Sequence, residues 1–298
     1  MAYLHRYVNS RIDPREALAG ARSVIAVALS YHQRRSAPVG LIERLSQEPS
    51  PLPLSLEGRG GMGIGTQEPT GRVAMYAWGE DYHRVMRRKL ETLVERIRVE
   101  IPVSFDARIC VDTTPVVERE LAASAGIGWI GKNTLVLNPS VGSYFFLGIV
   151  LTTLELEADA AMPDHCGTCT ACLDACPTKA FPAPYEMDAS RCISYLTIEH
   201  RGEIPASVHP AIGDWVFGCD VCQEVCPHNR DAPETREPAF APRRNIPELR
   251  LDDVLSWSPT DYARELQGSA MKRAKREMLQ RNARIVLENQ MDRQRGGT

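Results

Sequence analysis

The strongest constraint in this sequence is a group of eight cysteines between residues 166 and 226. The first run has the spacing Cys-x2-Cys-x2-Cys-x3-Cys-Pro, the second has Cys-x2-Cys-x3-Cys-Pro, and Cys192 lies between them. Such spacing is typical of loops that bind 4Fe-4S clusters, in which the fourth cysteine of a run ligates the neighbouring cluster. We therefore predict two clusters, one held by Cys166, Cys169, Cys172 and Cys226, and the other by Cys176, Cys192, Cys219 and Cys222.

Disulfide bonds and structural zinc are the alternative explanations. Disulfide frameworks dominate small secreted chains, whereas this sequence has 298 residues and begins without a secretory signal. Structural zinc is usually held by separated Cys-x2-Cys pairs, not by a run of four that ends in Cys-Pro. The ninth cysteine, Cys110, has apolar neighbours in a predicted strand, so we expect a buried and unreactive thiol.

Net charge and hydropathy limit the classes of partner that the sequence predicts. The net charge of −3 gives no overall attraction to nucleic acid, so any such contact must come from a local basic patch. No apolar run reaches the roughly 18 residues that a membrane span needs. Iron–sulfur ligands and free thiols favour a reducing compartment, and we expect a cytoplasmic protein.

Strands and helices are predicted ahead of the cysteines. Ser23 to Ser30 is a short apolar run, which indicates a buried strand. Residues 35 to 71 are rich in Pro, Ser and Gly and are predicted to be a flexible loop. Asp81 is a suitable cap for a helix that continues to about Glu100.

A possible catalytic carboxylate follows the next strand. Ala107 to Val111 is predicted to be extended, and it delivers Asp112 to a turn. Thr114 and Pro115 are expected to open a helix that stops at Gly126. Catalytic groups often project from such strand ends in α/β folds, but a capping role for Asp112 is an equal alternative.

Two further patterns concern backbone geometry. Residues 126 to 133 form a glycine-rich turn that allows close approach of the backbone to another group. Thr134 to Leu137 and Tyr144 to Thr153 are predicted to be a pair of strands, because the link between them has turn residues.

The C-terminal part is predicted to be helical, with Trp257 as a core candidate and a last helix from Ser269 to about Asn289. Met271, Met278 and Ile285 mark its apolar stripe. Its basic residues form either a solvated face or a contact for RNA phosphates. They are Lys272, Arg273, Lys275, Arg276, Arg281 and Arg284.

Several segments together resemble one family. They are AGARSVI (19–25), YAWGEDYH (76–83), VDTTPVVER (111–119), AGIGWIGKN (125–133), YLTIEHRG (195–202) and FGCDVCQEVCP (217–227). With these segments the chain resembles the epoxyqueuosine reductases, which are cobalamin-dependent iron–sulfur enzymes of tRNA queuosine synthesis. The resemblance covers about residues 1 to 289, apart from the loop at 35 to 71.

The resemblance implies a mixed fold in three parts. A reductase-like α/β domain would occupy residues 1–157, with the loop at 35–71, and a ferredoxin-like two-cluster domain would occupy residues 158–235. Residues 236–298 would be a short helical segment, the truncated start of a HEAT-like tail. The chain starts closer to the first shared segment than family members usually do, and its loop is longer.

The resemblance also implies the chemistry. Epoxyqueuosine at the wobble position of tRNA would be reduced to queuosine through a base-off cobalamin supplied with electrons by the two clusters. Asp112 matches the family's proton donor, and burial beside the corrin should raise its pKa. Expected corrin contacts, besides Asp112, are Met75, Lys132, Val136, Leu147, Ile198 and Gly202; expected tRNA contacts are His200, Lys272, Arg273, Lys275 and Arg276.

The expected partners are a tRNA anticodon stem-loop and an electron donor such as a flavodoxin or a ferredoxin. We expect no membrane association, and we expect the protein itself to be a monomer. A corrinoid iron–sulfur reductive dehalogenase is the main alternative function. A ferredoxin-type electron carrier without catalysis is the second, although a carrier needs no additional α/β domain.

Overall fold

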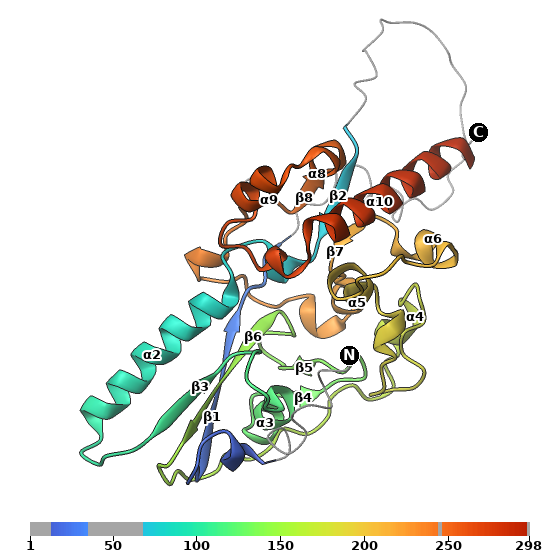
Figure 1. Ribbon diagram of the computed structural model, residues 1–298. Helices are drawn as coiled ribbons and strands as arrows, with labels where there is room; N and C mark the ends of the chain where they lie inside the picture. Colours follow the sequence, from blue (N-terminus) through green and yellow to red (C-terminus); the bar gives the residue numbers. More distant parts are fainter. Residues whose placement is uncertain (1–12, 35–67, 244–245, 297–298) are drawn as a thin grey trace, which may run out of the picture.

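The computed structural model describes residues 13–34, 68–243 and 246–296, and contains two three-stranded sheets surrounded by helices (Figure 1). The first twelve residues and positions 35–67 of the predicted loop lie outside the described residues. The chain therefore has mixed helix and sheet content. No helix in the described ranges is long and apolar enough to cross a membrane.

The first sheet is antiparallel and has the order β1-β6-β3. Its strands are β1 (Ser23–Ser30), β6 (Phe145–Thr152) and β3 (Ala107–Cys110). The bounds of β1 agree with the prediction, but the expected full burial is wrong, because β1 is an edge strand and its residues are mostly half-buried. The central strand β6 is buried along almost its whole length.

Successive residues of β1 face opposite sides of this sheet. Val27 packs in the main core with α2 (Tyr82–Glu100), whereas Val24 packs with Leu121 on the other face, in α3 (Glu118–Ser124). The predicted cap of α2 is confirmed, since the Asp81 side chain accepts a hydrogen bond from the His83 backbone at 3.1 Å.

The predicted start of α3 is wrong. The helix begins at Glu118, after Val117, and not at Thr114. Thr114 lies in a tight turn, in which its carbonyl accepts from the Val116 amide at 2.8 Å. The predicted stop is confirmed by the left-handed φ of 74° at Gly126.

The predicted pairing of residues 134–137 with residues 144–153 is also wrong. β5 (Val136–Leu137) pairs with β4 (Trp129–Ile130), whereas β6 pairs with β1 and β3. The close approach expected from the glycines takes place within this hairpin. A Cβ atom at Gly128 would lie 1.9 Å from the Leu137 carbonyl oxygen.

The second sheet collects distant parts of the chain. β2 (Thr70–Val73) lies between β7 (Trp215–Phe217), which is parallel to it, and β8 (Glu248–Arg250), which is antiparallel. These strands come from before, within and after the cysteine region. One hydrophobic core contains residues of both sheets, so the sheets are packed into one body.

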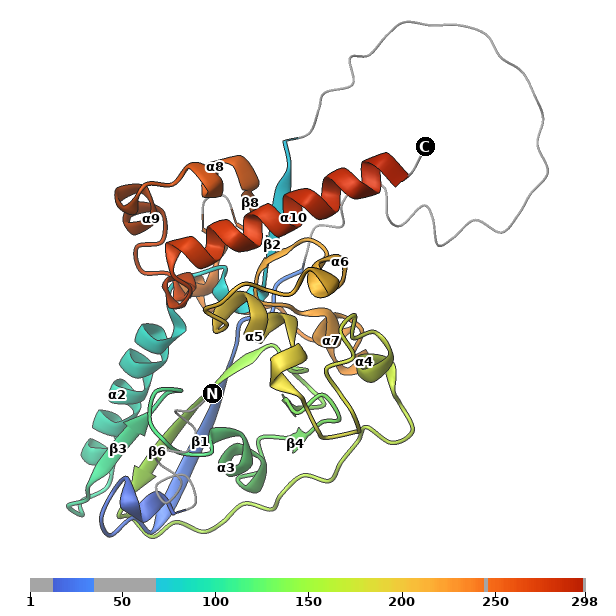
Figure 2. The same cartoon turned by 45° about the vertical axis from the view of Figure 1, so that its right-hand side comes forward.

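Helix α10 (Arg276–Gly296) lies across β7 and contacts α5 (Ile193–Ile198) and α6 (His209–Ile212) (Figure 2). The single helix predicted from Ser269 is wrong: Ser269 caps the short helix η8 (Ala270–Arg273), and Ala274 is extended before α10 starts. The apolar stripe of Met271, Met278 and Ile285 is buried as predicted, and so is Trp257.

The remaining elements are short. They are η2 (Pro14–Glu16), η3 (Met75–Ala77), α4 (Ala171–Asp174), η4 (Ala189–Arg191), α5 (Ile193–Ile198), η5 (Ala206–Val208), α6 (His209–Ile212), α7 (Val221–Glu224), η6 (Pro227–Asn229), η7 (Pro238–Phe240), α8 (Leu251–Ser256) and α9 (Pro259–Glu265).

Gly128→Ala should destabilise the protein, because the added methyl group meets the backbone of Leu137. We expect a loss of roughly 1–3 kcal/mol, as for overpacked cores, measured by denaturant unfolding. Gly202→Ala is the matched control, since its methyl group would meet only the His200 side chain, at 3.4 Å, and should change stability by less than about 0.5 kcal/mol. Equal effects of the two variants would contradict the role of Gly128.

Candidate active site

Asp112 lies just after β3, as predicted, and its backbone is held in an unusual conformation. Its φ of 54° is in the left-handed region, which costs a non-glycine residue free energy and is common at functional sites. The Asp112 amide donates to Glu118 Oε1 at 2.5 Å, which fastens the turn to the first residue of α3. The alternative role as a helix cap is wrong, because Val117 occupies the cap position.

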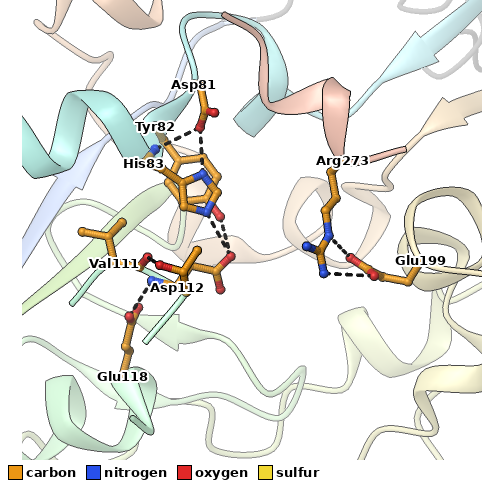
Figure 3. Close-up of polar contacts among 9 residues, drawn as sticks. Asp81, Tyr82, His83, Val111, Asp112, Glu118, Glu199 and Arg273 are labelled. Atoms are coloured by element: carbon orange, nitrogen blue, oxygen red, sulfur yellow. Dashed lines mark hydrogen bonds and ion pairs between the residues drawn. The ribbon is translucent and has the colours of Figure 1, made fainter. Parts of the chain in front are cut away.

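The first turn of α2 supplies the partners of the Asp112 carboxylate (Figure 3). Tyr82 donates its hydroxyl to Oδ2 at 2.9 Å, and His83 Nε2 lies 3.3 Å from the same oxygen. His83 Nδ1 lies 2.7 Å from Asp81 Oδ1. The Tyr82 ring stacks between His83 and Phe146, with centroid distances of 4.1 and 4.3 Å, and this packing fixes the orientation of both donors.

The electrostatics of this cluster favour a charged imidazole. Hydrogen bonds to Asp112 and Asp81 raise the pKa of His83 to about 9, because both ring nitrogens face carboxylate oxygens. An imidazolium has two N–H donors, one for each carboxylate. At neutral pH, His83 is therefore protonated and sits between two negative charges.

In the described structure the pKa of Asp112 is lowered, and the raised value expected beside a corrin stays a prediction. The hydrogen bond from His83 lowers the pKa of Asp112, and the hydrogen bond from Tyr82 adds to this effect. The side chain is 65% exposed in the described structure. The neighbouring Glu118 behaves in the opposite way: burial raises its pKa to about 7.

His83, Tyr82 and Glu118 were missed as functional residues by sequence reasoning. All three fall within the segments that carry the family resemblance, but nothing in the linear sequence indicates that His83 and Asp112 are in contact. That contact depends on how α2 crosses the first sheet.

Arg273 and Glu199 lie opposite this cluster in Figure 3. Arg273 Nε donates to Glu199 Oε1 at 2.7 Å, and a second guanidinium nitrogen donates to Oε2 at 3.1 Å. The Arg273 charge also contributes to the lowered pKa of Asp112. Of the residues expected to contact tRNA, Arg273 is thus the one that acts electrostatically on the candidate acid.

The other expected tRNA contacts differ in exposure. Lys272 and Lys275 are exposed. Arg276 is half-buried and donates to the Trp257 carbonyl at 3.3 Å. His200 Nε2 lies 2.9 Å from the Glu203 carbonyl oxygen. Arg281, which belongs to the same basic run, is buried and is therefore no part of a solvated face.

The residues expected to contact a corrin come from several elements. Met75, Val136 and Ile198 are buried, Leu147 is half-buried and Gly202 is exposed. The Met75 amide donates to Asp220 Oδ2 at 2.8 Å. Lys132 is buried and donates its ammonium to the carbonyls of Gly167 and Cys169, at 2.6 and 3.0 Å. These corrin contacts stay predictions.

The structure brings four cysteines of the first predicted set to one pocket, at the turn after β4. They are Cys166, Cys169, Cys172 and Cys226. Burial and the neighbouring Cys226 and Cys166 raise the pKa of Cys172 to about 11. No three His, Cys, Asp or Glu residues in the described part of the chain converge closely enough to chelate one metal ion. A four-iron cubane takes one thiolate at each iron, so its ligands need not converge on one point.

The second predicted set is more deeply buried. Burial raises the pKa of Cys222 well above its usual value, and the nearby Cys219 and Cys192 add to this. Burial likewise raises the pKa of Cys192, against backbone hydrogen bonds from Tyr195 and Ser194 that lower it, and the nearby Cys176 adds a smaller upward shift. Cys110, by contrast, is fully buried in the first sheet with apolar neighbours, as predicted.

Comparison with known protein families gives two matches. Residues 11–113 match the model described as "Epoxyqueuosine reductase QueG, DUF1730", and residues 165–229 match "4Fe-4S double cluster binding domain". The second match contains all eight clustered cysteines.

Curated relatives are also similar. An epoxyqueuosine reductase of Pseudomonas aeruginosa is 49% identical over 218 residues, which are 73% of this chain and 60% of that protein. One of Burkholderia pseudomallei is 40% identical and aligns with 100% of this chain and 73% of its own length. This chain thus spans about 60% of the Pseudomonas relative.

Solved structures are similar over nearly the whole chain. A crystal structure of epoxyqueuosine reductase with an epoxyqueuosine-modified tRNA-Tyr stem loop has a TM-score of 0.81 at 31% identity, and covers 95% of this chain and 69% of that one. A selenomethionine-labelled epoxyqueuosine reductase has a TM-score of 0.83 at 30% identity, and covers 97% and 71%.

The raised pKa of His83 predicts a pH-dependent contribution to stability. The charged pairs are formed in full below the unfolded-state pKa of about 6.5 and are lost as pH rises through about 9. His83→Gln should therefore lower the free energy of unfolding more at pH 6 than at pH 10. Denaturant unfolding at both pH values measures the difference.

NMR titration of the His83 ring provides the control for this prediction. Asp112→Asn removes one carboxylate partner and should lower the His83 pKa. An unshifted His83 pKa near 6.5 in the unaltered protein would contradict the proposed charge state.

Proposed function

Because this chain belongs to the epoxyqueuosine reductase family, we propose that it reduces epoxyqueuosine to queuosine at the wobble position of a tRNA. The reaction removes the epoxide oxygen as water and consumes two electrons and two protons. The observation that carries the proposal is the Asp81–His83–Asp112 cluster, a protonated imidazole hydrogen-bonded to a carboxylate that is open to a bound molecule.

The cysteines fit two 4Fe-4S clusters in their donor chemistry and grouping. In the proposed assignment one cluster is held by Cys166, Cys169, Cys172 and Cys226, which line one pocket. The other is held by Cys176, Cys192, Cys219 and Cys222, which raise one another's pKa values in the pairs described above. Each thiol must lose its proton to bind iron as a thiolate, so iron binding has to overcome these raised pKa values.

The exposure of the Asp112 carboxylate leaves room for a cofactor or substrate at this position. A bound cobalamin would supply the reductive carbon–oxygen chemistry, with electrons delivered by the iron–sulfur clusters. The proposed contacts, carried over from the family, are Met75, Lys132, Val136, Leu147, Ile198 and Gly202. The Lys132 ammonium is already engaged with backbone carbonyls, so its contact would be made by its aliphatic stem or its backbone.

The proton path is proposed from His83 to Asp112. In the described structure the proton resides on His83, 3.3 Å from Asp112 Oδ2. A molecule that covers Asp112 would exclude water, and desolvation raises the pKa of a carboxyl group. The shared proton would then move to Asp112, from which an alkoxide formed on opening of the epoxide can take it.

We propose the same division of the chain as the family implies: a reductase-like α/β domain at 1–157, a ferredoxin-like domain at 158–235 and a helical segment at 236–298. We further propose a cytoplasmic monomer that takes electrons from a flavodoxin or a ferredoxin. Reductive dehalogenation and simple electron transfer are less well supported, because the curated relatives are epoxyqueuosine reductases.

Asp112→Asn should reduce turnover of epoxyqueuosine-modified tRNA by roughly 100-fold or more, the usual range for loss of a general acid. The chemical iron content and cobalamin binding should stay at the level of the unaltered protein. The matched control is Asp253→Asn, at a half-exposed carboxylate that pairs with Arg250. Full activity of the Asp112 variant would remove this residue from the acid role.

Replacing both Lys272 and Lys275 by Ala should weaken binding of the tRNA stem-loop and lessen its salt dependence. The slope of log Kd against log salt should fall by about 1 to 2 if each lysine contacts one phosphate. Arg15 and Arg22 are exposed at the far end of the first sheet, and replacing both by Ala is the charge-matched control. An unchanged slope in the lysine variant would exclude phosphate contacts there.

A further inference from the structure

Asn133 carries an unpaired donor inside the pocket of the first cysteine set. Its side chain is 3% exposed. Among the described residues, its Nδ2 is the buried side-chain nitrogen or oxygen that has no hydrogen-bond partner. Its Oδ1 accepts from the Leu135 amide at 3.3 Å, which fixes the orientation of the amide group. A buried donor without a partner costs roughly 1–3 kcal/mol, so this arrangement points to a ligand.

Two neighbouring side chains direct donors to the same loop. Trp129 Nε1 donates to Cys166 Sγ at 3.4 Å. Lys132 is 9% exposed, and its ammonium donates to the carbonyls of Gly167 and Cys169, which places a buried positive charge inside the cysteine run. Three donors therefore come from one five-residue segment, Trp129 to Asn133.

The backbone explains why this segment can reach the cysteines. Gly131 has no side chain, and a Cβ atom there would lie 2.0 Å from Leu137 Cδ1 and 3.5 Å from Cys166 Sγ. The turn is held from the other side by α3, because Arg119 donates to the Thr134 carbonyl at 2.6 Å. The β4–β5 hairpin is thus held next to the cysteine loop.

We propose that Trp129, Lys132 and Asn133 form a hydrogen-bonding wall for the cluster bound by Cys166, Cys169, Cys172 and Cys226, with Asn133 Nδ2 donating to a cluster sulfide or thiolate. The proposal rests on the cluster assignment given above. Reduction adds a negative charge to the cluster, and donors and nearby cations stabilise that charge. The wall therefore raises the reduction potential of this cluster and leaves that of the other unaffected.

The test uses the 298-residue chain, reconstituted with iron and sulfide and without cobalamin. Asn133→Leu removes the donor while keeping the number and branching of the side-chain heavy atoms, and Asn133→Asp removes it and adds a negative charge. Trp129→Phe removes the indole donor, and Trp257→Phe is the matched control at a buried tryptophan of the main core. Iron content and a redox titration followed by EPR give the loading and the two midpoint potentials.

We expect one of the two midpoint potentials to fall in the three site variants. A tenfold shift of the reduction equilibrium corresponds to about 59 mV for a one-electron couple, and we expect about this shift for Asn133→Leu, with an equal or larger shift for Asn133→Asp. Trp129→Phe should shift the same potential in the same direction. Trp257→Phe should leave both potentials unchanged.

Several results would overturn the inference. Normal iron loading with unchanged potentials in the Asn133 and Trp129 variants would do so, and would leave the cluster assignment intact. In a separate titration with cobalamin, loss of cobalamin binding by the Asn133 variants without a change of potential would assign the Asn133 amide to the corrin and overturn the inference. If the unaltered protein binds no iron, the cluster assignment itself fails. Should Asn133→Leu lose iron, the isosteric Asn133→Asp and Trp129→Phe still decide the question.

Discussion

The parallel pairing of β2 with β7 holds the two halves of the candidate site together. β2 leads into η3 and then into the first turn of α2 with His83, whereas β7 leads directly into Cys219. Parallel strands end on the same side of a sheet, so both exits lie together. The Ala74 amide donates to the Phe217 carbonyl at 2.8 Å, and the Met75 amide donates to the buried carboxylate of Asp220. His83 and the proposed cluster ligand Cys219 are thus positioned by two paired strands of the same sheet.

Local signals in the sequence were sufficient for part of this architecture. The branched apolar run of β1 and the Asp81 cap of α2 are formed by neighbouring residues, and both are present as expected. The start of α3 and the partner of β5 were mispredicted for the opposite reason. Thr114 fits a helix cap locally, but the turn held by Glu118 forms in its place. The partner of β5 could not be predicted without knowing that Gly128 allows β4 to lie against it.

Only part of the chemistry of the site could likewise be predicted from the sequence. The cysteine spacing predicted two sets of ligands, and the structure brings the four cysteines of the first set to one pocket. The assignment of the two sets to two clusters stays a prediction. The charge state of Asp112 was not predictable in this way. Its pKa is set chiefly by His83, a contact between the start of α2 and the end of β3. A lone acid was expected, whereas the Asp112 carboxylate is hydrogen-bonded to Tyr82 and His83. The raised pKa of His83 and the lowered pKa of Asp112 place the proton on the imidazole at rest.

The buried Arg281 has a consequence for how the protein would respond to proteolysis. Its guanidinium donates to the carbonyls of Leu196, His200 and Gly202, which end α5 and the loop after it. Helix α5 starts directly after Cys192. A protease that trims α10 past this arginine would leave these three carbonyls without their guanidinium donor and loosen α5. Loss of the brown iron–sulfur colour would then accompany the cut, so retention of the colour during digestion reports that α10 is intact through Arg281.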